Sequence, residues 1–320
     1  MQNILTVQDL EIDILKDSKK IKIIDKISFA LKEKETLCIV GESGCGKTFT
    51  ALSIMGLLPK NSRVNGKIYF DKKDLLSLNE DSLRKIRGKE ISMVFQDPLT
   101  SLNPVFTIYD QLSEIILTHT KIDKNSVKGM CIDILKQVKI PDAENKINCY
   151  PHELSGGQRQ RVLIAMAIVL SPKIVILDEP TTALDVTIQA EILDLLKQLK
   201  DQKDLSAIYI THDLSVVSEV GDRVIVMYSG SIVEQGPKDE VLKNPLHPYT
   251  KGLIESIPDY EKPGKVLKPI PGYVPSPENR PKGCVFHPRC VYKKKICMEK
   301  TPLLTAVSEK HMVRCHLTGI

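Results

Sequence analysis

Apolar residues recur along the chain with two periods, one typical of strands and the other of helices. Alternation with period two covers residues 4–14 and 21–29, which predicts two half-buried strands. The apolar run at residues 36–40 predicts a short buried strand that leads into a glycine-rich loop. Helical spacing then covers residues 47–58, and Pro59 closes this predicted helix. Strand, glycine loop and helix therefore follow one another directly.

The middle of the chain continues to alternate between strand and helix. Ser155 can cap the helix that follows it, and two other predicted helices form an insert after Gln96. This alternation predicts a largely parallel sheet covered by helices on both faces. The strands are predicted at residues 66–70, 91–95, 173–177 and 207–210, and the helices at residues 108–119, 127–138, 155–170 and 188–199.

The last part of the chain has a different character. Ten prolines between residues 237 and 281 interrupt it, and clear periodicity disappears after about residue 236. We therefore expect one large domain over residues 1–240, followed by an appendage over residues 241–320 that adds nothing to the sheet.

Composition narrows the class of protein. The chain is 42% hydrophobic and 27% charged, which is ordinary for a globular protein. The longest apolar run, residues 162–170, is far shorter than the roughly 18 residues of a membrane-spanning helix, and the first residues lack the pattern of a signal peptide. We expect a cytosolic protein that meets a membrane through a partner. The net charge of +5 gives nucleic-acid binding little weight, so we expect no nucleic-acid partner.

The glycine loop matches the phosphate-loop pattern G-x-x-x-x-G-K-[ST] in the strand–loop–helix context that the pattern requires. Its backbone N–H groups can wrap the phosphates of a nucleoside triphosphate at a helix N-terminus. Lys47 is suited to reach the β and γ phosphates, and the hydroxyl of Thr48 is suited to bind Mg²⁺. The loop consists of Gly41, Glu42, Ser43, Gly44, Cys45, Gly46, Lys47 and Thr48.

Two adjacent acids end the apolar strand predicted at residues 173–177. Asp178 is suited to hold Mg²⁺, directly or through water, and Glu179 is suited to orient or deprotonate the attacking water. A strand that ends in Asp-Glu is more often a solvated turn, but the phosphate loop upstream favours the catalytic interpretation.

A serine and two glycines begin the helix predicted from Ser155. The segment Leu154, Ser155, Gly156, Gly157 and Gln158, followed by Arg159 and Arg161, resembles the signature motif of ATP-binding-cassette (ABC) ATPases. The segment also ends 20 positions before Asp178, a spacing similar to that in this family. A plain helix cap with a glycine turn is the structural alternative.

Further segments extend this resemblance over about the first 240 residues. Gln96 resembles the Q-loop glutamine, which implies that it senses Mg²⁺ and couples the site to membrane subunits. Ala183, Leu184 and Asp185 resemble the D-loop, and His212 resembles the switch histidine that contacts the γ-phosphate. One point departs from the family, because no aromatic residue that could stack on adenine lies near residues 14–16.

The resemblance implies an α/β fold of the P-loop NTPase class, with a RecA-like core, an antiparallel β subdomain, a helical subdomain over about residues 97–165 and a Cys-rich C-terminal extension. It also implies that two cassettes pair head to tail, so that the phosphate loop of one faces the signature motif of the other. ATP binding would then close the pair, and hydrolysis would release it.

The appendage refines the resemblance. Residues 244–250 and 281–290 are similar to the extension of oligopeptide and dipeptide permease ATPases, a group that includes some nickel importers. Cys284, Cys290, Cys297 and Cys315 are separated by five, six and seventeen residues. Thiolates at such spacing can wrap a soft metal centre, either Zn²⁺ or an iron–sulfur cluster. The resemblance favours a [4Fe–4S] cluster, with Zn²⁺ and free thiols as the alternatives.

The family implies an ATPase that lies on the cytoplasmic face of the membrane and powers the uptake of dipeptides or oligopeptides. Its partners would be a sister cassette, two transmembrane permeases and an external solute-binding protein. A nickel or other small-solute importer is the first alternative. A soluble ABC ATPase usually has two fused cassettes or a long coiled-coil insert, and this chain has neither. A nonhydrolytic regulatory subunit would be expected to lack Glu179 or His212.

Overall fold

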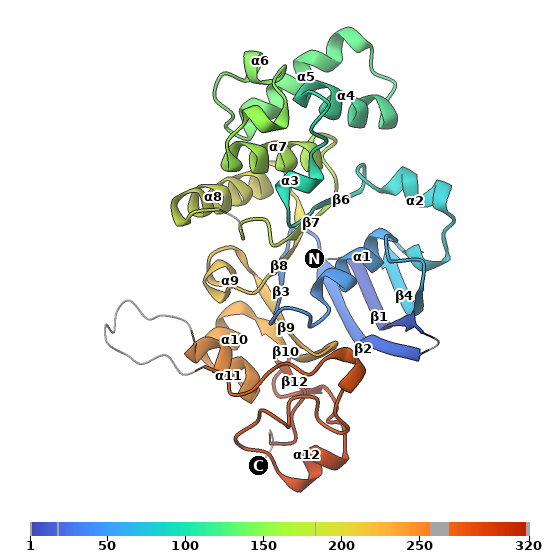
Figure 1. Ribbon diagram of the computed structural model, residues 1–320, viewed down its shortest axis with the longest axis vertical. Coiled ribbons are helices and arrows are strands. Elements are labelled where there is room, and N and C mark those ends of the chain that lie inside the picture. The colour runs from blue at the N-terminus through green and yellow to red at the C-terminus, as the bar shows by residue number, and fades with distance from the viewer. Residues whose placement is uncertain (1, 18, 183, 257–268, 318–320) are drawn as a thin grey trace. The chain divides into compact units, whose positions relative to one another are not determined.

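The chain folds into two units, the first formed by residues 1–77 and 209–320 and the second by residues 78–208. The computed structural model in Figure 1 describes residues 2–17, 19–182, 184–256 and 269–317. Within these residues, no helix combines the length and the apolar character needed to cross a bilayer. Ala183 of the expected D-loop lies outside the described residues, as do Pro258 and Pro263.

An antiparallel sheet forms the start of the first unit, in the strand order β2-β1-β4-β5. The two strands predicted from alternation are confirmed as β1 and β2, and both extend beyond their predicted ends. The reason is that the ladder continues into the polar hairpin, where Lys16 pairs with Lys19. The strands are β1 (Asn3–Lys16), β2 (Lys19–Lys32), β4 (Ser62–Phe70) and β5 (Lys73–Asp74).

A second group of strands in the first unit leads to the glycine loop. All five residues of β3 (Thr36–Val40) are buried, and β3 pairs in parallel with β9 (Arg223–Tyr228). β9 pairs antiparallel with β10 (Ser231–Pro237), so this part of the sheet is mixed. Neither β9 nor β10 is among the predicted strands. β8 (Ser206–Thr211), which was predicted, crosses the boundary between the two units.

Two helices of the first unit follow strand ends. α1 (Lys47–Met55) begins directly after the glycine loop, and α9 (Leu214–Val220) follows β8. α1 ends at Met55 rather than at the predicted Leu58. Gly56 adopts a left-handed φ of 62° and donates its N–H to carbonyl groups of the last turn, which terminates the helix.

The expectation that the C-terminal appendage adds nothing to the sheet is wrong. β12 (Met312–Val313) pairs with β10, and β11 (Thr305–Ala306) pairs with β12. Strands of two residues are too short to produce a periodic pattern, which is why the sequence does not predict them. The other elements of this region are α10 (Lys238–Lys243), α11 (Pro248–Glu255), η3 (Pro277–Asn279) and α12 (Lys295–Glu299).

The second unit contains the helical insert predicted after Gln96. Helix α7 contacts α3, α4 and α5, and strands β6 and β7 pair in parallel. The helices are α2 (Glu80–Ile86), α3 (Pro98–Ser101), α4 (Ile108–His119), α5 (Lys124–Gln137), α6 (Ala143–Lys146), α7 (Gly156–Ile168) and α8 (Val186–Lys203). The strands are β6 (Ile91–Val94) and β7 (Ile174–Asp178), and the turns are η1 (Leu75–Ser77), which belongs to the first unit, and η2 (Pro151–Glu153).

Candidate functional site

The glycine loop occupies a tight position between β3 and α1. Gly41 has a φ of 153°, and a Cβ atom built there would lie 2.2 Å from the carbonyl oxygen of Met227. Gly46 has a φ of 103°, and its Cβ would lie 2.4 Å from the Cδ1 of Ile24. Side chains at these two positions would clash, because the loop is pressed against neighbouring strands. Glycine is therefore required for the backbone to follow this path.

The first turn of α1 has the form that an anion site requires. Gly46 is the N-cap residue and has no side chain that could bond the first N–H groups of the helix. Lys47 is 5% exposed, and its Nζ donates hydrogen bonds to the carbonyl oxygens of Gly41 at 2.7 Å and Glu42 at 3.2 Å. Thr48 is exposed on the same turn. Positive charge and helix N–H groups thus gather at one end of α1.

Glu42 of the loop is held by residues from the C-terminal region. Its N–H donates to the Oη of Tyr249 at 2.9 Å. Its carboxylate accepts two hydrogen bonds from the guanidinium of Arg289, at 2.7 and 3.1 Å. Tyr249 and Arg289 lie within residues 244–250 and 281–290, but the sequence predicts no role for either residue. Their partner lies 207 and 247 positions away, and no local pattern connects them.

Aromatic rings pack beneath this contact. The rings of Tyr228, Tyr249 and Phe286 lie 4.7 to 5.4 Å apart, centroid to centroid. The guanidinium of Arg289 lies 5.8 Å from the centroid of the Tyr228 ring. Burial, and after it the charge of Glu42, raises the pKa of Tyr249, so its hydroxyl stays neutral. Burial opposes the charge of Arg289, but its interactions with Glu42 and Tyr228 together outweigh burial and raise the pKa of Arg289.

His212 also belongs to the first unit. It is exposed and lies between β8 and α9. Its neighbours fix the turn, because Asp213 caps α9 by accepting from the N–H of Ser215 at 2.8 Å. The N–H of Asp213 donates to the Oγ1 of Thr211 at 3.0 Å.

Three of the predicted catalytic and Mg²⁺-binding residues lie in the second unit. Asp178 ends β7 and is 3% exposed. Glu179 follows with a left-handed φ of 47°, an uncommon conformation for a residue with a side chain. Its carboxylate accepts from the Nε2 of Gln96 at 3.2 Å and from the Oγ1 of Thr182 at 2.9 Å. The structure therefore brings Gln96 and Glu179 together.

The predicted signature segment forms the start of α7. The Oγ of Ser155 accepts from the N–H of Gln158 at 3.3 Å, and the side chain of Gln158 accepts from the N–H of Ser155 at 3.1 Å. This reciprocal pair is a capping box, and it confirms that Ser155 caps the helix. Leu154 is buried, and its carbonyl oxygen accepts from Arg159 at 2.6 Å.

Gly156, Gly157 and Asp185 complete the set of predicted residues in this unit. A Cβ built on Gly157 would lie 2.8 Å from the Cγ2 of Ile188, so α7 approaches the start of α8 closely at this position. Gly156 is half-buried, and its Cβ would meet only the side chain of Leu184, at 3.8 Å. Asp185 is exposed and caps α8, because its side chain accepts from the N–H of Ile188 at 3.0 Å.

The predicted site residues therefore divide between the two units. The first unit contains the phosphate loop and His212. The second unit contains Gln96, Asp178, Glu179, Asp185 and the signature segment at residues 154–158.

The four C-terminal cysteines lie near one another. The N–H of Cys284 donates to the carbonyl oxygen of Cys297 at 2.8 Å. Burial, and after it the nearby Cys297, Cys315 and Cys290, raises the pKa of Cys284 to about 11. Thiols suit a soft metal in donor type. However, no group of three or more His, Cys, Asp or Glu side chains within the described ranges is placed to hold a metal ion.

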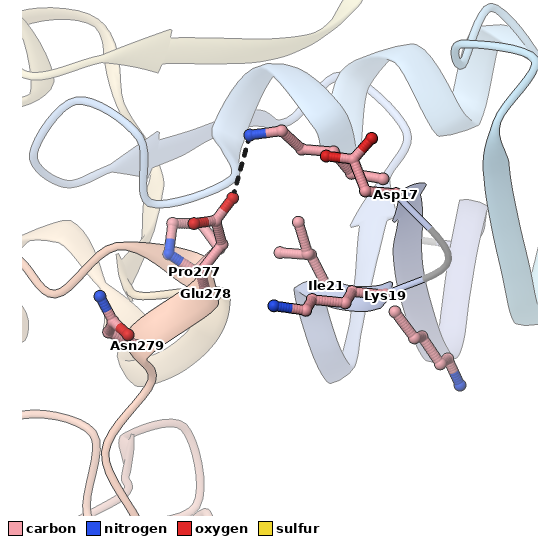
Figure 2. Close-up of a pocket in the computed structure, with 8 residues that line it drawn as sticks. Asp17, Lys19, Ile21, Pro277, Glu278 and Asn279 are labelled. Atoms are coloured by element: carbon pink, nitrogen blue, oxygen red, sulfur yellow. Dashed lines mark hydrogen bonds and ion pairs between the residues drawn. The ribbon is translucent and has the colours of Figure 1, made fainter.

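A cavity of about 380 Å³ lies at the tip of the β1–β2 hairpin (Figure 2). Lys16, Lys19 and Ile21 line it from the hairpin, and residues 277–279 line it from η3. An ion pair of 3.2 Å joins the Nζ of Lys16 to the Oε1 of Glu278. Residues 277–279 of the C-terminal region thus lie beside the tip of this hairpin.

Comparison with known proteins identifies the family of this chain. The sequence profile of the family described as ABC transporter matches residues 24–182, and that of the oligopeptide/dipeptide transporter C-terminal region matches residues 233–297. The dipeptide transport ATP-binding protein DppD of Bacillus subtilis (strain 168) is 46% identical over 319 residues, which cover 99% of this chain and 95% of that protein. The oligopeptide transport ATP-binding protein OppD of the same organism is 48% identical over 98% of this chain and 88% of that protein.

A solved structure has a similar fold. The ATP-binding cassette MJ0796, solved as a dimer in a post-hydrolysis state bound to ADP and Pi, has a TM-score of 0.66 and 27% sequence identity. The alignment covers 73% of this chain and 98% of that cassette. The expected P-loop NTPase fold is confirmed. The chain belongs to the ABC transporter family of ATPases, in the group that carries the oligopeptide/dipeptide transporter C-terminal region.

Proposed function

We propose that this chain hydrolyses ATP to drive an importer of dipeptides or oligopeptides. The observation that carries the proposal is the start of α1, which has no side-chain cap and where Lys47 contacts the loop backbone. The chain also shares 46% and 48% sequence identity with two transport ATP-binding proteins. Those relatives are named for dipeptide and oligopeptide transport, and each matches nearly the whole chain. The cargo class is therefore inferred from the relatives, and the chemistry from the site.

The phosphates of ATP are proposed to bind at the start of α1. The N–H groups of the first turn and the ammonium of Lys47 would neutralise the phosphate charge. To do so, Lys47 must exchange its two carbonyl partners for phosphate oxygens. Mg²⁺ would be held by Thr48, Asp178 and Gln96, whose hydroxyl, carboxylate and amide oxygens are the ligands it prefers. When bound, the ion supplies charge neutralisation at the β and γ phosphates.

Glu179 is proposed to orient or deprotonate the attacking water. A general base must hold its carboxylate in a fixed direction, and the bonds from Gln96 and Thr182 restrict this one. His212, exposed at the end of β8, is proposed to contact the γ-phosphate. Hydrolysis in this scheme depends on positioning and electrostatics rather than on covalent chemistry by the protein.

The active form is proposed to contain two cassettes. The chain carries one phosphate loop and one signature segment, and the solved cassette MJ0796 is dimeric. Leu154, Ser155, Gly156, Gly157 and Gln158 would complete the nucleotide site of a sister cassette, with Asp185 beside them. We expect a heterodimer bound to two transmembrane permeases on the cytoplasmic face of the membrane, and a solute-binding protein that delivers the cargo.

The adenine base is proposed to rest on aliphatic side chains near the hairpin of β1 and β2. No aromatic residue lies among residues 14–16, whereas Ile21 and the alkyl stem of Lys16 line the cavity in Figure 2. Competition between ATP and GTP checks this placement. We expect similar affinities for the two nucleotides, and a strong preference for ATP would contradict it.

The four C-terminal cysteines are proposed to bind a [4Fe–4S] cluster with a structural role, with Zn²⁺ as the alternative. Support comes from their donor type and their proximity. Protein purified without oxygen should be brown and contain about four iron atoms per chain if the cluster forms. Replacing Cys290 by Ser should remove the colour, whereas the same change at the buried Cys131 should not. A colourless protein with one zinc per chain would establish the alternative.

Uptake assays in a strain that lacks this chain test the proposed cargo. Complementation with the wild-type gene should restore uptake of labelled dipeptides or oligopeptides, and a Lys47→Ala gene should not. Restored uptake of nickel with no peptide uptake would replace the peptide assignment with the nickel alternative.

A further inference from the structure

We infer that Arg289 and Tyr249 are positioning residues for the phosphate loop, so that nucleotide affinity depends on the C-terminal region. This inference rests on the proposed function, because it assumes that the loop binds ATP. It concerns residues of the first unit only, and all the contacts described below lie within that unit.

Glu42 is fixed through three of its groups. Its N–H donates to the Oη of Tyr249, its carbonyl oxygen accepts from the Nζ of Lys47, and its carboxylate binds the guanidinium of Arg289. Two of these three contacts come from the C-terminal region. The path of the loop from Gly41 into Ser43 is therefore set by residues that lie more than 200 positions away.

Arg289 is itself held rigidly. Its side chain is 4% exposed and packs against the ring of Tyr228. Its Nε donates to the carbonyl oxygen of Pro271 at 2.9 Å, and its Nη2 donates to that of Ile270 at 3.3 Å. A guanidinium fixed in this way presents its two-pronged edge to a carboxylate in one orientation only. Arg289 can thus transmit the position of the C-terminal region to Glu42.

The backbone of Tyr249 is held equally firmly. It is fully buried in the first turn of α11, and its N–H donates to the Nδ1 of His247 at 3.0 Å. The N–H groups of Leu246 and His247 donate to the carboxylate of Glu234 on β10, at 2.8 and 2.9 Å. The hydroxyl that receives the N–H of Glu42 is therefore anchored to the sheet.

The C-terminal contacts add to the bonds of Lys47, because three of the loop residues are glycines and have no side chains to pack. Gly41, Gly44 and Gly46 all have positive φ, and a Cβ built on Gly44 would meet no atom within 4 Å. The end of the loop is held by the turn between β9 and β10, since the N–H of Gly230 donates to the carbonyl oxygen of Cys45 at 2.9 Å. The start of the loop is held by Arg289 and Tyr249. A loop fixed before the ligand arrives loses less entropy on binding.

Arg280 offers a matched control. It lies in the same C-terminal region, and its side chain is 15% exposed. Its Nη2 donates to the Oδ2 of Asp25 and to the Oγ of Ser231, both at 2.8 Å. Arg280 thus ties the C-terminal region to β2 and β10 as Arg289 ties it to the loop. The two arginines differ in whether they touch the phosphate loop.

Titration of the full-length chain with a fluorescent ATP analogue, together with ATPase measurements, tests the inference. We expect Arg289→Gln to weaken nucleotide binding and raise KM on the order of tenfold, with kcat changed less than twofold. Arg289→Lys should recover part of the loss, and Tyr249→Phe should show a smaller loss. Arg280→Gln should lower the melting temperature but leave the dissociation constant within twofold of wild type.

A double substitution separates positioning from general destabilisation. If Arg289 acts through Glu42, adding Arg289→Gln to a Glu42→Gln chain should weaken binding little beyond Glu42→Gln alone. Unchanged affinity in Arg289→Gln, or an equal loss of affinity in Arg280→Gln, would overturn the inference. A wild-type chain that binds no ATP would instead overturn the proposed function, so the two failures are distinguishable.

Discussion

Glycines lie at the starts of both α1 and α7, at Gly46 and at Gly156, yet the first turns of the two helices are held in opposite ways. The N-cap of α7 is Ser155, which exchanges hydrogen bonds with Gln158 within one turn. The N-cap of α1 is Gly46, which has no side chain, and the loop before it is held by the β9–β10 turn and by the C-terminal region. One helix start is stabilised locally, and the other depends on residues far along the chain.

This difference has a chemical meaning. A capping side chain satisfies N–H groups that a ligand would otherwise bind, whereas a glycine cap leaves them to an anion. α1 is therefore suited to bind phosphate through its own backbone, with Lys47 beside it. The start of α7 keeps its shape without a ligand, which suits a surface that completes the site of another cassette.

Lys47→Ala is the strongest way to test the phosphate-binding half of this comparison. We expect the dissociation constant for ATP to rise about 100-fold, because the charged hydrogen bonds to the phosphates are lost. Isothermal titration calorimetry measures the change, and Ser155→Ala is the control that should keep the affinity of the isolated chain. Normal affinity in Lys47→Ala would show that α1 does not bind the phosphates.

The pH dependence of unfolding tests the support of the loop through α11. Burial lowers the pKa of His247 to about 3, so the folded state keeps the ring neutral. The unfolded state binds one more proton between about pH 6.5 and 3, so stability is present above pH 6.5 and is lost as the pH falls. The loss should be about 1.4 kcal/mol per pH unit, or about 2 kcal/mol between pH 6.5 and 5.

His247→Asn separates this contribution from those of other groups. An Asn oxygen can still accept from the N–H of Tyr249 and cap α11. Denaturant unfolding at several pH values should therefore give a flatter curve for His247→Asn, by about 2 kcal/mol between pH 6.5 and 5. Parallel curves for wild type and variant would show that His247 does not contribute.

Ser155→Ala has the smallest expected effect and tests the local half of the comparison. Removing the cap should lower the free energy of unfolding by about 1 kcal/mol, since the N–H of Gln158 loses its acceptor. Ser155→Asp, which can still cap, should restore most of the stability. A change within experimental error for Ser155→Ala would mean that the capping box adds little to the start of α7.

Local signals explain which parts of the fold could be predicted. The starts of α1 and α7 follow from the pattern G-x-x-x-x-G-K-[ST] and from Ser155 with Gln158, which act within a few residues. The bounds of β3 and α4 were also predicted correctly, because their apolar periods are strong. These features depend on interactions between residues close together in the chain, and such interactions can be predicted from the sequence.

Long-range pairing explains what could not be predicted. β12 is two residues long and exists because β10 offers it an edge. The contact of Arg289 with Glu42 joins positions that are 247 residues apart, and neither residue stands out locally. The candidate site was thus predicted in its motifs, whereas the residues that hold its loop in place required the structure.

The mass of the Glu179→Gln chain in the presence of ATP and Mg²⁺ tests the account most directly. This substitution should leave ATP binding intact while slowing turnover about 100-fold or more, so that the nucleotide holds two cassettes together. Light scattering should then show the 35.8 kDa chain doubling its mass, alone or mixed with its paired cassette, and Lys47→Ala should abolish the change. An unchanged mass at saturating ATP in both samples would contradict a nucleotide bound between two cassettes.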